Sequence, residues 1–337
     1  MRTCWLLVVI AIAGWRPPVV SAAEPGFSVM CWNLEWFFDD SKQGNYSALA
    51  REKSAPTRGL WNWRRDAVAA SIAEVQPSIV ALQEVEGPRV LWYLARALDR
   101  EHGLKYQDNA IEGEDHATEQ DVGILTTRPT EVLTLMRGEV TGSMQRQETY
   151  AGVTKHLAAL IEIPVAGQIE TILVVNVHLR SGVAAERLRQ KQAASLLRWM
   201  QVWQRSSTHV MVVGDFNTQE LAGEVAGGSE MAILMGRRTA DPQDDLVDLI
   251  EQVPVARRQT HLLSGKQFDR IIVSRSLIGD EPGRPDLCLR SVDVRPDLSI
   301  RGGADLLDEH WNHYWEIDAA NRDLSDHYPL VAEFEIR

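Results

Sequence analysis

Short runs of apolar residues, each bounded by Gly, Asn, Asp or His, recur along this chain of 337 residues. The clearest run is V-M-V-V at 210–213, which ends at Gly214. A continuous β-branched run bounded by glycine is typical of a strand that is covered on both faces. Similar runs predict further strands at 27–33, 78–83, 122–126, 157–163, 169–177, 268–274, 287–294 and 330–336.

Three other segments place apolar residues at helical spacing instead. Segment 61–75 has such a pattern and is ended by Pro77, which cannot continue a helix. Segments 88–100 and 184–203 each carry one apolar stripe. We expect these stripes to pack into a core rather than to form a binding surface.

The remaining segments are mostly polar and predict loops. We expect an aromatic-rich loop at 34–40, a surface excursion at 41–60, an acidic loop at 108–119, a Gly-rich stretch with a short helix at 219–245, and a long polar insertion at 295–324. No repeat or linker divides the chain. The pattern predicts one layered α/β or α+β domain with a mixed sheet core.

The first 23 residues predict a signal peptide. Arg2 gives a positive start, 6–13 is an apolar segment too short to span a bilayer, and V-S-A at 20–22 suits a signal peptidase. We expect cleavage after Ala22 or Ala23, a domain at 24–337, and export to the periplasm or the medium. An uncleaved N-terminal anchor is the alternative. No other segment resembles a membrane span, so we expect no stable membrane insertion.

Composition narrows the function classes further. The formal net charge is −12, which argues against a protein that coats nucleic acid electrostatically. It does not exclude an enzyme that acts on a phosphodiester, because a bound divalent cation inverts the field at an acidic site. Export permits a disulfide between Cys31 and Cys288, but small buried thiols are common, and we favour two independent core cysteines.

Polar residues follow the predicted strands at the points where the strands end. Asp215 and Asn217 come directly after 210–213 and point the same way on an extended backbone. An Asx turn is the alternative for this pair alone. Comparable groups follow or open other strands, and we expect all of them to meet at one rim. They are Asn33, Glu84, Asn176 with His178, Asp269, and Asp326 with His327.

The chemistry of this set favours a hard cation. Carboxylate and amide oxygens suit Mg²⁺, Mn²⁺ or Ca²⁺ better than zinc. His178 and His327 have no second histidine at the helical spacing of a zinc-protease motif. Arg180 lies just past His178, where it could contact a substrate phosphate or could simply be solvated.

Seven segments in order resemble the endonuclease/exonuclease/phosphatase superfamily, which includes DNase I-like nucleases. They are C-W-N-L-E (31–35), I-V-A-L-Q-E-V (79–85), D-V-G-I-L (121–125), V-N-V-H-L-R-S-G (175–182), V-G-D-F-N (213–217), F-D-R-I-I-V-S (268–274) and L-S-D-H-Y-P-L (324–330). The resemblance implies an α/β fold of four layers, with two packed mixed β-sheets flanked by helices. It also implies phosphoester hydrolysis with a divalent metal, Mg²⁺ or Mn²⁺.

Residue by residue, the resemblance implies distinct roles. Glu84 would be the main metal carboxylate, with Asn33 and Asp326 beside it. Asp215 would orient or deprotonate the attacking water. The other implied roles are phosphate or water contacts for Asn217 and Asn176, an imidazole beside the phosphate for His327, its carboxylate partner for Asp269, and leaving-group assistance for His178. A surface ion pair with Arg270 is the alternative for Asp269.

The substrate is less closely defined, because one fold serves many substrates. We expect an exported nuclease that cleaves nucleic-acid phosphodiesters. A sphingomyelinase-like enzyme that binds a lipid head group, or a phosphatase of small phosphoesters, is the alternative. A non-catalytic binding module is remote, because Glu84, Asp215 and His327 are all present. The sequence does not determine the oligomeric state.

Several residues of the 295–324 insertion and one pair elsewhere have open roles. Trp311, Tyr314 and Trp315 could touch lipid, stack on bases or pack the loop, and we favour packing. We expect His310 and His313 to face solvent rather than bind a metal. Lys155 and His156 precede a strand and could line the cleft.

Overall fold

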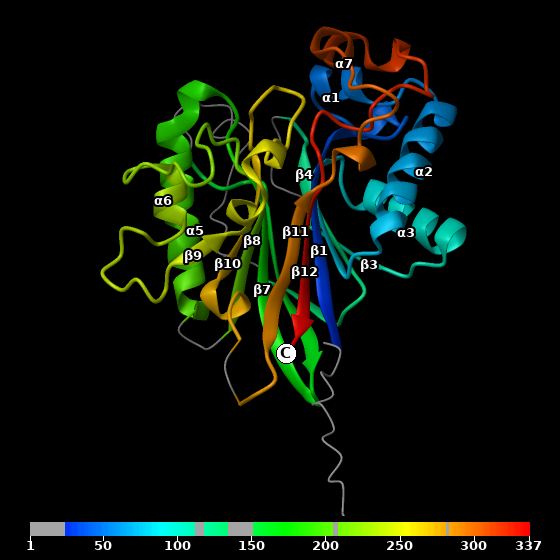
Figure 1. Cartoon of the computed structure of the whole chain (residues 1–337). Helices are drawn as coiled ribbons and strands as arrows, with labels where there is room; N and C mark the ends of the chain where they lie inside the picture. The colour runs from blue at the N-terminus through cyan, green and yellow to red at the C-terminus, as the bar shows by residue number, and fades with distance from the viewer. Residues whose placement is uncertain (1–23, 112–117, 134–150, 205–207, 281–282) are drawn as a thin grey trace, which may run out of the picture.

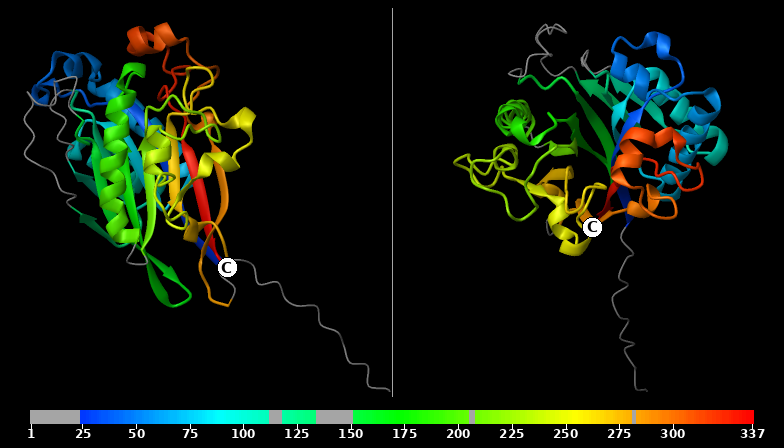
Figure 2. Two further views of the ribbon diagram at one scale, coloured as in Figure 1. Left: turned by 90° about the vertical axis from the view of Figure 1, so that its left-hand side faces the viewer. Right: turned by 90° about the horizontal axis from the view of Figure 1, so that it is seen from above.

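Two six-stranded sheets face one another in the computed structural model, which describes residues 24–111, 118–133, 151–204, 208–280 and 283–337. The first sheet has the strand order β11-β12-β1-β2-β4-β3, and the second has the order β5-β6-β7-β8-β10-β9. Helices cover the outer face of each sheet, as Figures 1 and 2 show. The predicted fold, four layers with two mixed sheets between helices, is confirmed.

The first sheet is built from β1 (Glu24–Phe37), β2 (Ile79–Val85), β3 (Gln107–Ile111), β4 (Asp121–Thr126), β11 (Leu287–Val294) and β12 (Leu330–Ile336). The second sheet is built from β5 (Thr130–Leu133), β6 (His156–Val165), β7 (Gln168–His178), β8 (His209–Asp215), β9 (Leu246–Asp248) and β10 (Asp269–Ser274). The α-helices are α1 (Ala48–Lys53), α2 (Arg58–Val75), α3 (Pro88–His102), α5 (Glu186–Gln204), α6 (Glu230–Leu234) and α7 (Leu307–His313).

Alternation along the strands divides the core into three layers. The inner layer lies between the sheets and includes Val29 and Cys31 from β1 and Val213 from β8. The alternate residues of the first sheet pack against α2 and α3, and those of the second sheet pack against α5 and α6. Because central strands are covered on both faces, they read as continuous apolar runs, which is why they could be recognised.

Gly214 brings β7 and β8 close together. Its φ is +142°, and a Cβ added there would lie 1.9 Å from the Val177 carbonyl oxygen of β7. Only glycine therefore lets the backbone of β8 approach its neighbour this closely. Asp215, the next residue, is paired in register with His178 of β7.

Several predicted loops contain regular structure. Strand β1 continues through the expected loop at 34–40 as far as Phe37, and α1 and the start of α2 lie within 41–60. Strand β3 occupies part of the expected acidic loop at 108–119, and α7 lies in the insertion. Figure 1 shows α7 beside α1 at the upper end of the molecule. These expectations were wrong because pairing and packing with distant segments decide such conformations.

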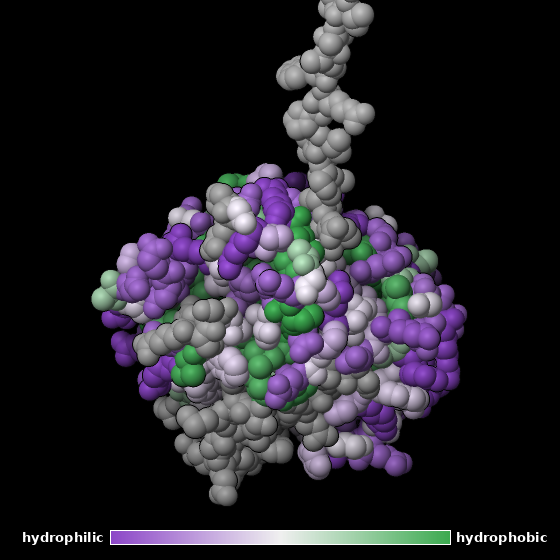
Figure 3. All heavy atoms as spheres, turned by 90° about the horizontal axis from the view of Figure 1, so that it is seen from below, coloured by the Kyte–Doolittle hydropathy of each residue, from purple (hydrophilic) through white to green (hydrophobic). Residues whose placement is uncertain are grey.

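Other features match the sequence analysis or lie outside the described residues. Cys31 and Cys288 are both buried and unpaired, as favoured. Among the described residues, no helix combines the length and apolar character needed to cross a bilayer. The predicted signal peptide at 1–23 lies outside them. Seen from below, at the end where β12 finishes, apolar residues are scattered among hydrophilic ones (Figure 3).

Candidate active site

The predicted functional residues meet at one end of the two sheets. Strands β1 and β2 run parallel, as do β7 and β8, so their carboxyl ends share an edge. Strands β12 and β10 run antiparallel to β1 and β8, so they begin at that edge. This arrangement brings together Asn33 of β1, Glu84 of β2, His178 of β7, Asp215 of β8, Asp269 of β10, and Asp326 with His327 before β12.

Asp215 lies at the centre of this group and is only 2% exposed. Its Oδ2 accepts hydrogen bonds from Asn33 Nδ2 at 3.0 Å and Asn217 Nδ2 at 3.1 Å. Its Oδ1 accepts one from the backbone N–H of Asn217 at 2.8 Å. The sequence offered an Asx turn as the alternative to a site at Asp215 and Asn217. The structure has both, because the turn is what fixes the carboxylate.

Glu84 stands beside Asp215. Asn33 Nδ2 lies 3.3 Å from its Oε1, while the backbone N–H of Trp36 and the side chain of Gln120 donate to its Oε2. Burial raises the pKa of Glu84 to about 7, against the opposing charge of Lys155. Asn33 thus bridges two carboxylates through its nitrogen. Its Oδ1 accepts from the backbone N–H of Glu35, and its role as a metal ligand stays a prediction.

The backbone around Glu84 is strained. Glu35, Trp36 and Glu84 all have positive φ values, of 43°, 50° and 59°. Non-glycine residues hold such conformations only where their surroundings enforce them, and these cluster at functional sites. At the end of β1 the enforcing group is Arg64 of α2, which is buried and donates to the carbonyl oxygens of Leu34, Glu35 and Trp36.

His327 is held by Asp269. The distance from His327 Nδ1 to Asp269 Oδ2 is 2.8 Å, and Asp269 is fully buried. Burial opposes a charge on His327, but Asp269 and Asp326 outweigh it and raise the pKa well above the ordinary value. His327 is therefore an imidazolium with Nε2 turned toward the centre, 3.9 Å from Asp215 Oδ2. The histidine-partner interpretation of Asp269 holds. Arg270 pairs instead with Asp248, in the interior.

His178 is also buried at the site but is neutral. Its Nε2 lies 3.5 Å from Asp215 Oδ2 and 3.7 Å from Glu84 Oε1. Burial, together with the charges of Lys155 and His327, lowers its pKa well below the usual value. Its Nδ1 has no hydrogen-bond partner.

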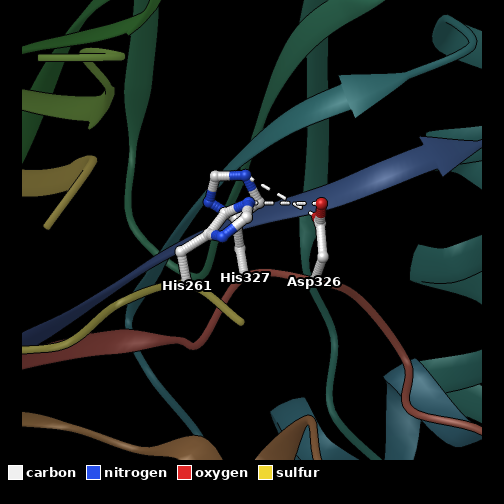
Figure 4. Close-up of side chains that lie close together, drawn as sticks. All are labelled: His261, Asp326 and His327. Atoms are coloured by element: carbon white, nitrogen blue, oxygen red, sulfur yellow. Dashed lines mark ion pairs between the residues drawn. The ribbon is translucent and has the colours of Figure 1, made fainter. Parts of the chain in front are cut away.

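Asp326 is oriented by two neutral donors that the sequence did not reveal. His261 Nδ1 accepts from the backbone N–H of Leu263 at 2.8 Å, so the ring proton is on Nε2, which lies 3.2 Å from Asp326 Oδ2. Trp311 Nε1 donates to the same oxygen at 2.8 Å. Figure 4 shows His261 and His327 gathered on one side of Asp326. The other oxygen, Oδ1, is buried without a hydrogen bond.

This donor set fits a hard divalent cation. Ligand atoms of Glu84, His178 and Asp215 lie within 4.8 Å of one another, and so do those of a second group made by His261, Asp326 and His327. Several buried carboxylates converge, and two of their buried oxygens, Asp326 Oδ1 and Asp269 Oδ1, accept no hydrogen bond; the first lies 3.7 Å from His327 Nε2. A cation would stabilise the ionised form of Glu84, whose pKa is otherwise raised.

The two residues predicted to contact the substrate, Asn176 and Arg180, have different surroundings. Asn176 is fully buried, and its Nδ2 donates to the carbonyl oxygens of Leu82 and Gly123 while its Oδ1 accepts from Gln83. Its amide is committed to joining the two sheets, and its phosphate contact stays a prediction. Arg180 is exposed, just beyond His178, and its phosphate contact stays a prediction.

The structure also shows the surroundings of the residues whose roles the sequence left undecided. Lys155 Nζ donates to Gln120, which in turn donates to Glu84, so Lys155 does border the site. His156 is buried against the Val153 carbonyl oxygen. His310 is 1% exposed and pairs with Glu35 and Asp305, so the expectation that it faces solvent was wrong. His313 is exposed, as expected.

Some functional residues left a weak signal in the sequence. Arg64 precedes Val68 and Ile72 by one and two turns, so it lies on the apolar stripe of its helix, where a lone arginine indicates a buried partner. Gln120, His261 and Trp311 follow no strand end or motif. They could not be found without the fold.

Comparisons with known proteins agree with this arrangement at the level of the fold. No family model and no curated protein matches the chain. Among solved structures, the human Nocturnin catalytic domain with bound sulfate is 18% identical, with a TM-score of 0.55 over 93% of this chain and 96% of that one. An endonuclease/exonuclease/phosphatase family protein from Bacteroides thetaiotaomicron is 15% identical, with a TM-score of 0.54 over 93% and 99%.

A third structure is that of D. rerio TDP2 complexed with a single-strand DNA product. It is 17% identical, with a TM-score of 0.51 over 92% of this chain and 98% of that one. At these identities the likeness establishes the fold.

Proposed function

Since the chain has the fold of the endonuclease/exonuclease/phosphatase superfamily, we propose that it is a metal-dependent phosphoester hydrolase and, more narrowly, a nuclease. One observation carries the proposal. Glu84, Asp215 and the His327–Asp269 pair, from distant parts of the chain, converge beside Asp326, whose buried Oδ1 accepts no hydrogen bond. Hydrolysis of a phosphodiester needs an activated water and charge neutralisation on the phosphate, and these groups supply both.

Glu84 and Asp326 would hold the cation, which would neutralise charge on a phosphate oxygen. Asp215, fixed by Asn33 and Asn217, is suited to orient the attacking water and accept its proton. His327, kept charged by Asp269, would donate to the charge that develops on the phosphate. His178, as a neutral imidazole, can donate only one hydrogen bond, and the leaving oxygen is a suitable acceptor.

Nucleic acid is favoured as the substrate by the single-strand DNA product bound to the D. rerio TDP2 structure, which shares the fold. The acidic surface does not oppose this choice, because specificity can depend on local contacts. A lipid phosphodiester or a small phosphoester is the alternative. Mg²⁺ or Mn²⁺ is the proposed ion, because the candidate ligands are chiefly carboxylate oxygens.

The test is a side-by-side assay of the purified protein on plasmid DNA, RNA, sphingomyelin and bis-p-nitrophenyl phosphate, with Mg²⁺ or Mn²⁺ and then with EDTA. We expect nucleic acid to be hydrolysed and EDTA to stop the reaction. Hydrolysis of lipid alone would overturn the nuclease proposal but keep the hydrolase. Absence of metal-dependent hydrolysis on every substrate would overturn both.

Export is a separate proposal that rests on the sequence of residues 1–23. Intact-mass measurement of the protein from its own cells tests it. A mature chain that begins at Ala23 or Glu24 in the exported fraction is expected. An intact Met1 on a protein retained inside the cells would contradict the proposal.

A further inference from the structure

A cavity of about 140 Å³ lies beside the candidate active site, between the last residues of β1 and of α1 on one side and residues 310–316, called here the α7 segment, on the other. Its walls combine charged residues with four large aromatic ones, which are Trp36, Trp311, Tyr314 and Trp315. Lys53 at the end of α1 donates to the carbonyl oxygen of Trp311, which joins the two sides. Figure 1 shows α1 and α7 next to each other at the upper end of the sheets.

Two of the lining residues donate hydrogen bonds directly to carboxylates of the candidate active site. The backbone N–H of Trp36 donates to Glu84 Oε2 at 3.1 Å, and the indole of Trp311 donates to Asp326 Oδ2 at 2.8 Å. Any phosphoester placed between Glu84 and Asp326 therefore has the cavity within reach of its neighbouring group. That neighbouring group is what the cavity can select.

Several charged groups around the cavity already have partners. Glu35 is paired with His310, and Arg64 is bonded to backbone carbonyl oxygens. The guanidinium of Arg64 also lies 4.7 Å from the ring centre of Tyr314 and 5.9 Å from that of Trp315. A quaternary ammonium would have to share these ring faces with an existing cation. A neutral planar group meets no such opposition.

Size and shape agree with a planar ring. A protein cavity of about 150 Å³ holds benzene, so this volume is on the scale of one aromatic ring. Aromatic side chains bind nucleobases by stacking, whatever the sequence, because every base has a π-face.

We propose that this cavity takes the nucleobase next to the scissile phosphate, with Trp36 as its main contact. The inference rests on the proposed nuclease function and adds a specificity determinant to the same site. It predicts that a nucleotide is hydrolysed faster than a backbone of the same charge that lacks the base.

Dinucleoside monophosphates test this directly, because each has a single phosphodiester bond. We would compare thymidylyl-thymidine with two analogues in which one base or the other is replaced by hydrogen. For the unaltered protein, removal of one particular base should lower kcat/KM by about tenfold, the scale of one stacking contact. The protein Trp36→Ala should lose the same factor on the intact dinucleotide and little more on that analogue.

The exposed Trp92 of α3 supplies the control. Trp92→Ala should leave the ratio between intact and base-free substrates unchanged. Equal cleavage of all three dinucleotides by the unaltered protein would overturn the inference without any variant, even if Trp36→Ala proved unstable. The inference would also be overturned if Trp36→Ala lowered kcat/KM by the same factor on every substrate.

Failure of the underlying proposal would look different. If neither dinucleotides nor plasmid DNA are cleaved while sphingomyelin is, the nuclease function itself is wrong. A loss of sphingomyelin hydrolysis in Trp36→Ala would then assign the cavity to a lipid head group and overturn the nucleobase.

Discussion

The indole Nε1 of Trp311 donates a hydrogen bond to Asp326 Oδ2 at 2.8 Å, which ties the α7 segment to a carboxylate of the candidate active site. His261 Nε2, at 3.2 Å, donates to the same oxygen. Because both bonds fall on Oδ2, the carboxylate is oriented with Oδ1 free of hydrogen bonds and facing His327 Nε2 at 3.7 Å. An element that the sequence presented as a polar insertion therefore helps to position a proposed metal ligand.

Replacing Trp311 with phenylalanine tests this positioning role. Trp311→Phe keeps an aromatic ring but removes the N–H donor, so Asp326 should lose one of its two restraints. We expect kcat to fall by about tenfold, or about 1.4 kcal/mol of transition-state stabilisation, with a smaller change in KM. Trp92→Phe, on the surface, is the matched control. An unchanged kcat would show that the hydrogen bond does not position Asp326 for catalysis.

Asp215→Asn and His327→Ala test the roles of the water-orienting carboxylate and the charged imidazole. Each should lower kcat by about 10³-fold, the scale of a lost acid–base group. Thermal unfolding should show that both variants remain folded. Asp66→Asn, in an exposed ion pair, should keep full activity. If either site variant turns over at the normal rate, its assigned role is wrong.

Binding of the metal can be followed without any substrate. Mg²⁺ or Mn²⁺ should raise Tm, by an amount equivalent to about 2.7 kcal/mol at a concentration one hundred times Kd. Glu84→Gln should reduce this shift strongly, because a candidate ligand loses its charge. Glu74→Gln, on the exposed side of α2, should retain it. Equal shifts in the two variants would contradict the assignment of Glu84.

The ion pairs of His310 with Glu35 and Asp305 predict that the stability of the fold depends on pH. Burial opposes the charge of His310, yet Glu35 and Asp305 raise its pKa from 6.5 to about 10. A histidine with a raised pKa stabilises the fold fully below pH 6.5, and this contribution is lost as the pH rises toward 10. His310→Gln should therefore lower the free energy of unfolding by about 3 kcal/mol at pH 6 and by much less at pH 10.

Urea unfolding of both proteins across this pH range gives the comparison. His313→Gln is the control, because that side chain is 54% exposed. A difference between the original protein and His310→Gln that does not change with pH would mean that His310 is not charged in the fold.

Gly214→Ala tests the close approach of β7 and β8. The added Cβ would lie 1.9 Å from the Val177 carbonyl oxygen, so the two strands would have to separate. We expect a loss of about 4 kcal/mol of stability or failure to fold, as for other backbone-incompatible substitutions. Gly227→Ala, where nothing lies within 4 Å of the added Cβ, should change Tm little. A normal Tm for Gly214→Ala would contradict the geometry.

Sequence patterns predicted the central strands well and the edge strands poorly. Strands β3, β5 and β9 were not predicted, and each ends a sheet. An edge strand is paired on one side only, so it needs less apolar character and leaves a weaker pattern. The central strands β1, β2, β7 and β8 are covered on both faces and carry the long apolar runs that revealed them.

The same distinction applies to the site. Glu84, Asp215, Asp269 and His327 were predictable because each lies where an apolar run begins or ends. His261 and Trp311 were not, because their contacts with Asp326 depend on how loops pack over the strand ends. Asn176 occupies a strand-end position in the sequence, but its side chain is buried. Its Nδ2 donates hydrogen bonds to the carbonyl oxygens of Leu82 and Gly123.

The last strand has a consequence for how such a protein is made. β12 inserts between β11 and β1, and Asp326 and His327 immediately precede it. A ribosome must therefore synthesise the chain as far as His327 before this pair exists to meet Asn33. A prematurely terminated product would carry Glu84 and Asp215 yet remain inert. If the protein is a nuclease, the producing cell is spared its activity throughout translation.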